Sequence, residues 1–364
     1  MRECDMSSSG APRARLRGVL ARLITITTTS FAGLYLFLFF TNNESNIFIF
    51  MANVFAPAFL VLTLGLTLLA ELLNVIRKRR SALQHRIVRG ALIVSFLVPT
   101  VVGEVRSHPR REISGIISGS VFTVLDANLL GPVELDPDFY DQVARRGPDI
   151  ITLQELNPTV AERLSARLGD GYPCKVLDPK PAVFGMGVFS RYPCSKRDST
   201  KFPPAIGIPQ IVDIQLPNNK TVGVINVHTI PPHTFIKRSR NDSDLRQLSH
   251  AILERERFVE EMITISRAVS TDAIILTGDF NATTRNRVYS LVRRMRLFDS
   301  FSSGSRMRGG TWPGPQFPLP SWMVRIDFIF HCAGLTSLST ETLPSGYGSD
   351  HRGLIATLAF IQPH

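Results

Sequence analysis

The sequence predicts an α/β fold in which two packed β-sheets are flanked by helices, preceded by an α-helical membrane region. After about position 105, short apolar runs typical of about nine strands alternate with helical segments and polar turns. Polar and apolar residues alternate in some of these runs, which favours a two-sheet sandwich over an all-parallel sheet. Before that position the apolar runs are long and carry few charges, which indicates that this part of the chain lies in a lipid bilayer.

Three apolar stretches predict the membrane region. Residues 23–40 are uncharged and close to the length that crosses ~30 Å of hydrocarbon. Residues 47–76 contain one charge, Glu71, and are long enough to span with tilt. The third stretch, 87–105, has charges near its ends, so a re-entrant or interfacial segment is the alternative to a span. We expect about three transmembrane helices within 23–105, after a basic N-terminus over 1–22.

The basic residues predict the orientation of these helices. Arginines precede the first stretch and a basic cluster follows the second, whereas residues 41–46 carry no Lys or Arg. The positive-inside rule then places residues 1–22 and the second loop in the cytoplasm. Three spans put the remaining chain outside, and two would put it inside. We favour three, because the apolar run 90–103 is hard to place in water, and expect an integral membrane protein with an extracytoplasmic domain.

The distribution of charge removes an apparent argument for nucleic-acid binding. The formal net charge is +11, but residues 1–111 hold 14 Lys and Arg against 5 Asp and Glu. Residues 112–364 hold 27 against 25. Most of the excess positive charge therefore belongs to the membrane region rather than to the domain that follows it.

The elements of the domain are expected over residues 121–361, after a connector over 106–120. The first helix begins near Pro137 and ends at Gly147, and a second, long helix covers 243–268 because its apolar residues share one face. The expected strands are VFTVL, IITLQEL, VFGMGVFS, IVDIQL, TVGVINVH, DAIILTGDF, RIDFIFH and LIATLAF.

The four cysteines fit no zinc spacing and are too few for a disulfide scaffold. Cys174 and Cys194 would pair in an oxidising compartment. The alternative is two unrelated free thiols.

Polar residues gather at the ends of the predicted strands, where open sheets expose functional groups. Any one of them alone is usually a turn former, but together they indicate a site. The set is Asn128, Glu155, His228, Asp279, Asn281, Asp350 and His351. Carboxylate and amide oxygens without clustered thiols favour Mg²⁺, with Mn²⁺ or Ca²⁺ as alternatives, over zinc. Such a set predicts hydrolysis of phosphate esters.

Six strings in order carry a resemblance to a known family: LQEL, GVFSRYP, INVHTIPPH, LTGDFNA, RIDFIF and GSDHRGL. They resemble the endonuclease/exonuclease/phosphatase superfamily, which includes deoxyribonuclease I, abasic-site endonucleases, neutral sphingomyelinases and inositol-polyphosphate 5-phosphatases. The resemblance covers about residues 120–361 and implies a deoxyribonuclease I-like fold. Membrane segments ahead of such a domain are also similar to a group of uncharacterised bacterial membrane proteins.

The resemblance also implies roles for the residues that match its motifs. Glu155 would be the main metal carboxylate, helped by Asn128, and Asp350 would complete the metal site or support its neighbour. Asp279 and Asn281 would orient or deprotonate the attacking water and hydrogen-bond the phosphate. His351, paired with Asp327, would contact the phosphate, and His228 would stabilise developing charge or protonate the leaving oxygen.

Two positions depart from the family pattern. Asp126 stands two residues before Asn128, so it either adds a second carboxylate to the metal site or caps the next turn. Nuclease members of the family often pair the first histidine with a glutamate, and the string GMGVFSRYP offers none. The surroundings of His228 are therefore expected to differ from those in the nucleases.

The substrate stays open between two classes. Seven arginines between 285 and 308, with Arg285 and Arg287 directly after the GDFNATT string, would form a basic rim for nucleic acid or anionic lipid, or a solvated helix face. Trp312 would stack on a base, dip into the membrane interface or pack its loop. We expect a nuclease-like phosphoesterase acting on phosphodiesters or phosphomonoesters, with a lipid or inositol-phosphate phosphoesterase and an inactive binding domain as alternatives. The expected partners are the phosphate-ester substrate and the bilayer, and no protein partner is inferred.

Overall fold

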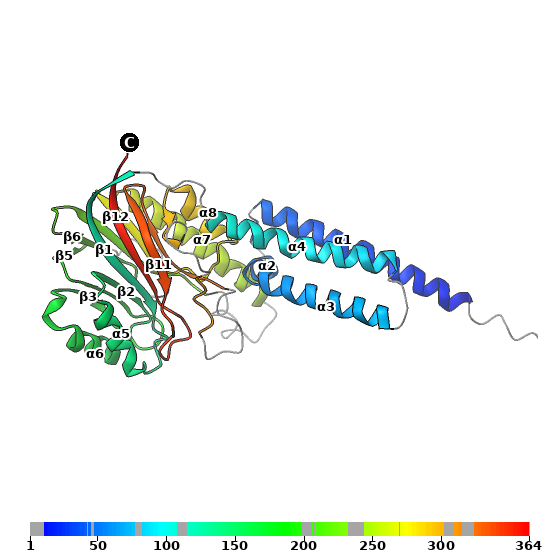
Figure 1. Ribbon diagram of the computed structural model, residues 1–364, viewed down its shortest axis with the longest axis horizontal. Helices are drawn as coiled ribbons and strands as arrows, with labels where there is room; N and C mark the ends of the chain where they lie inside the picture. Colours follow the sequence, from blue (N-terminus) through cyan, green and yellow to red (C-terminus); the bar gives the residue numbers. More distant parts are fainter. Residues whose placement is uncertain are drawn as a thin grey trace, which may run out of the picture.

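The structure, a computed structural model, places a β-sandwich at one end of a bundle of long helices (Figure 1). It describes all residues except 1–10, 42, 45–46, 77–81, 108–114, 199–205, 207, 232–243, 269, 302–308, 315–323 and 364. The two parts are joined at the end of the bundle where a short helix, α2, lies beside the sandwich.

Three of the N-terminal helices are long and apolar enough to cross a membrane. The candidate spans are 19–40 in α1 (Ala11–Phe40), all of α3 (Ala56–Ile76), and 83–106 in α4 (Leu83–Ser107). Their apolar side chains are largely exposed, as expected for helices that face hydrocarbon rather than a protein core. Arg89 of α4 pairs with Glu71 of α3 at 2.6 Å, so these two charges in the bundle balance each other.

The stretch 47–76 is two helices rather than the single one that its composition predicts. It divides at Phe55 into α2 (Ile47–Val54) and α3. Pro57 lies in the first turn of α3, where a helix tolerates proline because the missing N–H would have no partner there. The division leaves α2 free to pack against the sandwich, and Ile47, Phe50 and Val54 are buried in that contact.

The described strands form two six-stranded mixed sheets, which confirms the predicted two-sheet architecture. The first sheet has the order β11 (Leu335–Thr342), β12 (Leu354–Pro363), β1 (Gly115–Asn128), β2 (Ile150–Gln154), β4 (Met186–Ser190), β3 (Cys174–Asp178). The second has the order β5 (Cys194–Lys196), β6 (Gln210–Gln215), β7 (Thr221–His228), β8 (Ala273–Asp279), β10 (Asp327–His331), β9 (Phe298–Asp299). Only β1 with β2 and β7 with β8 pair in parallel among these described strands.

Helices cover the outer face of each sheet. Helix α5 (Pro137–Arg146) begins where Asp136 accepts a hydrogen bond from the Asp138 amide and ends at Gly147, whose φ of 53° suits a left-handed cap. With α6 (Pro158–Leu168) it packs on the first sheet. On the second sheet lie α7 (Asp244–Ala268) and α8 (Arg287–Arg294), joined there by α2. A third apolar cluster fills the space between the sheets.

The predicted strands all form, and the ones that sequence reasoning missed are mostly short or lie at sheet edges. Strand β1 begins at Gly115, six residues before the predicted start, because its first part pairs with β12 beyond a register shift after Ile117. Edge strands β3, β5, β9 and β11 have mixed exposure and therefore lack the continuous apolar run of a central strand.

A disulfide joins the two sheets at one edge. Cys174 in β3 and Cys194 in β5 are bonded, with their Cα atoms 5.6 Å apart. These strands are the outermost members of their sheets on the same side of the sandwich. The bond therefore closes the rim of the interface between the sheets.

Removing this bond is expected to destabilise the domain. Its loop has a sequence separation of 20 residues. Replacing both cysteines with serine should lower the free energy of unfolding by about 3 kcal/mol, chiefly because the unfolded chain regains conformational freedom. Denaturant unfolding of the full chain in detergent measures it, with Cys332→Ser as control, because Cys332 forms no disulfide. Equal stability of the double variant and the wild type would contradict the bond's structural role.

Candidate active site

The site lies where the two parallel strand pairs end. Asn128 and Glu155 end or follow β1 and β2 in one sheet, and His228 and Asp279 end β7 and β8 in the other. His228 is the register partner of Asp279, and Asp279 is also the register partner of Asp327 in β10. The pairing of the strands therefore fixes these three side chains next to one another.

A glycine allows the close approach of β7 and β8 at this point. Gly278 has a φ of 137°, and a Cβ there would lie 1.9 Å from the Val227 carbonyl oxygen. No other residue fits beside β7 in that conformation. The glycine of the GDFNA string thus places Asp279 at the end of its strand.

Asn128 joins the two sheets by its side-chain amide. Its Nδ2 donates to Glu155 Oε1 at 3.1 Å and to Asp279 Oδ2 at 3.0 Å. The Gly131 amide donates to the other Glu155 oxygen at 3.0 Å. Glu155 has a φ of 55°, an uncommon backbone conformation for a residue with a side chain, and such conformations cluster at functional sites. The two carboxylates are thereby held close together in a buried setting.

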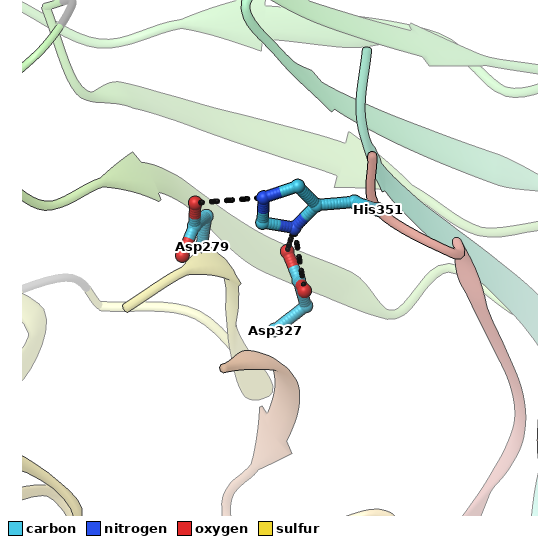
Figure 2. Close-up of side chains that lie close together, drawn as sticks. All are labelled: Asp279, Asp327 and His351. Atoms are coloured by element: carbon cyan, nitrogen blue, oxygen red, sulfur yellow. Dashed lines mark hydrogen bonds and ion pairs between the residues drawn. The ribbon is translucent and has the colours of Figure 1, made fainter. Parts of the chain in front are cut away.

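His351 and Asp327 form a hydrogen-bonded pair (Figure 2). The imidazole Nδ1 lies 2.9 and 3.1 Å from the Asp327 oxygens, and Nε2 points to Asp279 Oδ2 at 3.8 Å. Burial alone would lower the pKa of His351, but the charge and hydrogen bond of Asp327, with Asp279 and Asp350, raise it to about 10. His351 is therefore cationic at neutral pH and presents Nε2 to the site.

His228 also lies beside these carboxylates, and its charge state differs from that of His351. Its Nε2 is 3.8 Å from Glu155 Oε1 and 3.6 Å from Asp279 Oδ2. Complete burial, with the positive charge of His351 adding to it, lowers the pKa of His228 to about 3. One neutral and one cationic imidazole thus face the same pair of carboxylates.

Asn281 is held by three backbone and side-chain contacts. Its amide N–H donates to Asp279 Oδ1 at 2.7 Å, and its side-chain Nδ2 donates to the Thr229 carbonyl at 2.9 Å. Its own carbonyl accepts from Arg255 of α7 at 2.9 Å. Like Glu155, Asn281 has a positive φ, of 46°. The turn after β8 is therefore fixed from several directions.

Asp350 and Trp312 contact each other at the rim. Trp312 Nε1 donates to Asp350 Oδ2 at 3.2 Å, and the other Asp350 oxygen lies 4.0 Å from His351 Nε2. Trp312 is half-buried. In this structure the tryptophan that we expected to bind substrate orients a carboxylate of the site.

Asp126 lies one layer below these residues, between the sheets. It is fully buried, and its Oδ1 accepts from Thr152 Oγ1 at 2.8 Å and from Gln154 Nε2 at 2.9 Å. Burial, and then the charge of Asp327, raises its pKa to about 7. These hydrogen bonds join Asp126 to β2 and not to Glu155. Asp126 therefore supports the ends of β1 and β2 from the inside of the sandwich.

Three of the five described arginines of the basic rim make internal contacts, and the other two, Arg294 and Arg296, are exposed. Arg285 is buried and donates to carbonyls of α2, and Arg287 is paired with Glu256 at 3.4 Å and Glu260 at 3.8 Å. Arg293 donates to the Leu297 carbonyl. Arg306 and Arg308 lie outside the described residues.

Three contributors to the site escaped sequence reasoning. Ser349 donates to the Asn128 carbonyl at 2.7 Å and accepts from the His351 amide, so it ties two strand ends together. Arg255 and Gly131 are the others. Ser349 belongs to the GSDHRGL string and could have been noticed there. Arg255 sits in a helix whose sequence shows only an amphipathic pattern.

The donor set fits a divalent cation with a preference for oxygen. The carboxylates of Glu155 and Asp279 converge with little access to water. Burial raises the pKa of each, and at Asp279 the charge of Asp327 and then that of Glu155 add to the rise. A cation would relieve both effects. Ligand atoms of Asp279, Asp327 and His351 also lie within 4.8 Å of one another. Because Asp327 is hydrogen-bonded to the imidazole of His351, it is a poor ligand, and Glu155 is the better-placed carboxylate for the cation.

The fold and the site define a class of protein: a two-sheet α/β sandwich with carboxylate and amide groups and two histidines gathered near its strand ends. A family model described as "Endonuclease/Exonuclease/phosphatase family" matches residues 127–351. The chain belongs to this family, and it is a hydrolase of phosphoester bonds, as the sequence predicted.

Solved structures agree on the fold. A family protein from Bacteroides thetaiotaomicron is 18% identical over 67% of this chain and 97% of its own, with a TM-score of 0.51. One from Bacteroides vulgatus is 16% identical over 66% and 100%, with a TM-score of 0.50. Sphingomyelinase C from Streptomyces griseocarneus is 17% identical over 66% and 99%, at 0.46. No curated protein sequence matches the chain.

Neutralising Asp327 is expected to shift the pH dependence of hydrolysis. In Asp327→Asn the pKa of His351 falls, because the largest favourable charge beside it is gone. Wild-type His351 keeps its proton until the pH approaches about 10, so the variant should lose activity at a lower pH. At neutral pH the loss should be about a hundredfold.

The pH profiles of kcat for both proteins measure this effect. Asp213→Asn, which removes a partly exposed partner of Arg197 in β6, is the control and should keep the wild-type profile. Identical profiles for Asp327→Asn and the wild type would contradict the role of the pair.

Proposed function

We propose that the protein is a membrane-anchored, divalent-metal-dependent phosphoesterase whose catalytic domain lies on the extracytoplasmic side. The observation that carries the proposal is the convergence of Glu155 and Asp279 between a neutral His228 and a cationic His351. The complete set argues against an inactive binding domain, because such a domain has no need of one neutral and one cationic imidazole beside the same carboxylate.

Each residue has a proposed role. Glu155 and Asp350, with Asn128 beside them, would hold Mg²⁺, or Mn²⁺ or Ca²⁺ in its place. The metal, when bound, would polarise a phosphoryl oxygen. Asp279 and Asn281 would orient the attacking water, and Asp279 would take its proton. His351, held by Asp327, would bind an anionic phosphoryl oxygen, and His228 would hydrogen-bond the oxygen on which charge develops.

The contacts of the first external loop support the extracytoplasmic placement. Glu44 lies between the first two candidate spans and accepts a hydrogen bond from the Arg287 amide of the sandwich. Both segments would then lie on the same side of a bilayer, which supports three spans over two. The C-terminal end of α3 and the N-terminal end of α4 lie at the far end of the bundle (Figure 1), and the basic residues between them favour the cytoplasm.

The disulfide adds an independent argument for this side. Bonds such as Cys174–Cys194 persist in oxidising compartments and are rare in the cytosol. Protease protection in intact cells tests the placement: an exposed sandwich is digested from outside. Full protection, with digestion only after lysis, would refute it.

Two classes of substrate are candidates: nucleic acids, and lipids or inositol phosphates. The active-site chemistry suits a nuclease-like phosphodiesterase. A lipid or inositol-phosphate phosphoesterase is favoured by a separate observation, because α2 and α4 contact the sandwich directly and arginines expected at a nucleic-acid surface are paired internally. This arrangement keeps the site near the bilayer.

A side-by-side assay separates the candidates. The full-length protein, reconstituted in vesicles, is given plasmid DNA, RNA, sphingomyelin and phosphoinositides at several salt concentrations. Faster turnover of the lipids with weak dependence on salt would support a lipid enzyme. Preference for nucleic acid, with affinity that falls steeply as salt rises, would support a nuclease.

A further inference from the structure

The segment between the first two spans forms part of the catalytic domain's core. Ile47, Phe50 and Val54 of α2 belong to the same buried cluster as Phe280, within the GDFNATTRN string, and Val288, just after it. A domain that was only tethered would need no such contact. The segment over residues 44–54, here called the docking segment, is described except for residues 45–46.

Glu44 is the polar centre of this contact. It is 2% exposed and accepts from the Arg287 amide at 2.9 Å and from Asn286 Nδ2 at 3.2 Å. It also accepts from Asn53 Nδ2, whose side-chain oxygen accepts from Tyr35 of α1 at 2.9 Å. Asn286 precedes α8 and makes no side-chain cap of its own, so Glu44 satisfies the first N–H of that helix.

Arg285 completes the contact from the other side. Its guanidinium donates to the Asn53 carbonyl at 2.6 Å and to the Val54 carbonyl at 2.9 Å, where α2 ends. Gly103 of α4 lies against the same side chain, and a Cβ there would be 2.5 Å from Arg285 Cγ. Tyr289 donates to the Arg106 carbonyl of α4 at 3.2 Å. The start of α8 is therefore clamped between α2 and α4.

Two routes lead from the docking segment to the active site. Asn286, held by Glu44 through Nδ2, accepts through Oδ1 from both the amide and the hydroxyl of Thr283, each at 2.8 Å. This closes the turn over residues 283–286, two residues after Asn281. Separately, the Phe50 ring lies 4.3 Å from the guanidinium of Arg255, which donates to the Asn281 carbonyl. The second route thus ends on the residue expected to orient the attacking water, and the first fixes the turn that directly follows it.

We propose that Glu44 is a positioning residue, which fixes the turn over residues 281–286 through Asn286 and so keeps Asn281 in its working orientation. The proposal rests on the proposed function for its catalytic readout. It makes the membrane region part of the active-site scaffold, in contrast to a simple anchor. Loss of the contact should affect turnover more than substrate binding, because the binding groups lie on other strands.

The test uses the full-length protein in detergent and a small soluble substrate, bis-p-nitrophenyl phosphate, with Mn²⁺. Glu44→Gln keeps the size of the side chain but replaces one accepting oxygen with a donor facing Arg287 N–H or Asn53. We expect kcat to fall about tenfold, since small misplacements of reacting groups have large effects. KM should stay within about twofold of the wild-type value, because the other groups assigned to substrate binding lie on other strands. Glu44→Asp, which keeps the charge, should recover part of the loss.

Glu71→Gln is the matched control, because it makes the same change in the membrane region at a residue paired with Arg89. It should keep the wild-type kcat. If Glu44→Gln does not fold, Phe50→Leu replaces it, since it removes only the ring beside Arg255 and should also lower kcat alone. A wild-type kcat in the folded Glu44 or Phe50 variant, or an equal loss in Glu71→Gln, overturns the proposal.

Hydrogen exchange separates this proposal from the proposed function. If the wild type hydrolyses nothing, the proposed function fails, and the amides of residues 281–287 then decide. Faster exchange there in Glu44→Gln and unchanged exchange in Glu71→Gln support the positioning role. Unchanged exchange in both variants refutes it.

Discussion

Replacing Asp279 with asparagine is expected to abolish nearly all hydrolysis. This carboxylate lies at the centre of the site, 3.6 Å from His228 Nε2 and 3.8 Å from His351 Nε2, and it accepts from the Asn281 amide at 2.7 Å. An amide has almost the same shape but can neither take a proton from water nor balance the charge of His351. We expect kcat/KM to fall by about 10³, the middle of the range for loss of a general base.

Steady-state hydrolysis of bis-p-nitrophenyl phosphate by the full-length protein measures this effect. The matched control is Asp272→Asn, just before the start of β8, where the carboxylate is exposed and pairs with Lys220 at 2.7 Å. It should keep the wild-type rate. A folded Asp279→Asn protein that retained a tenth or more of the activity would show that the general base lies elsewhere.

The second large effect is expected at Glu155. Glu155→Gln removes the charge that we assign to the metal while keeping an oxygen for Asn128 to bind. The metal concentration that gives half-maximal activity should rise about 10- to 100-fold. High metal should restore part of the rate, because Asp350 and Asn128 remain. Titration of activity with Mn²⁺ measures the shift.

The control for this titration is Glu162→Gln. Glu162 is exposed in the second turn of α6, the helix that packs on the first sheet. Its curve should overlay that of the wild type. Overlapping curves for Glu155→Gln and the wild type would contradict the assignment of Glu155 as a metal ligand, even if both proteins were equally active.

Most of the fold was predictable because its central strands are buried on both faces. Strands such as β2 and β4 are buried along their whole length, so their sequences are continuous apolar runs. Strand β5 is three residues with mixed exposure and has no such pattern. The break at Phe55 was missed because α2 and α3 are both apolar, although α2 faces protein and α3 faces outward.

The site was predictable to the extent that it depends on strand ends. Asn128, Glu155, His228 and Asp279 could be placed together because each ends or follows an apolar run, and parallel neighbours bring such ends to one edge. The positions of Arg285 and Asp126 could not be predicted in this way. Arg285 is buried by a helix more than 200 positions earlier in the chain, and Asp126 faces the second sheet. Contacts between distant segments leave no local pattern.

The most direct test of a metal-dependent phosphoester hydrolase at these strand ends is the rate of p-nitrophenol release from bis-p-nitrophenyl phosphate by the purified full-length protein. With Mg²⁺ or Mn²⁺ present, we expect steady release that stops on addition of EDTA and returns when excess metal is added. Release that is absent under all metals, or that continues unchanged in EDTA, would contradict the site as described.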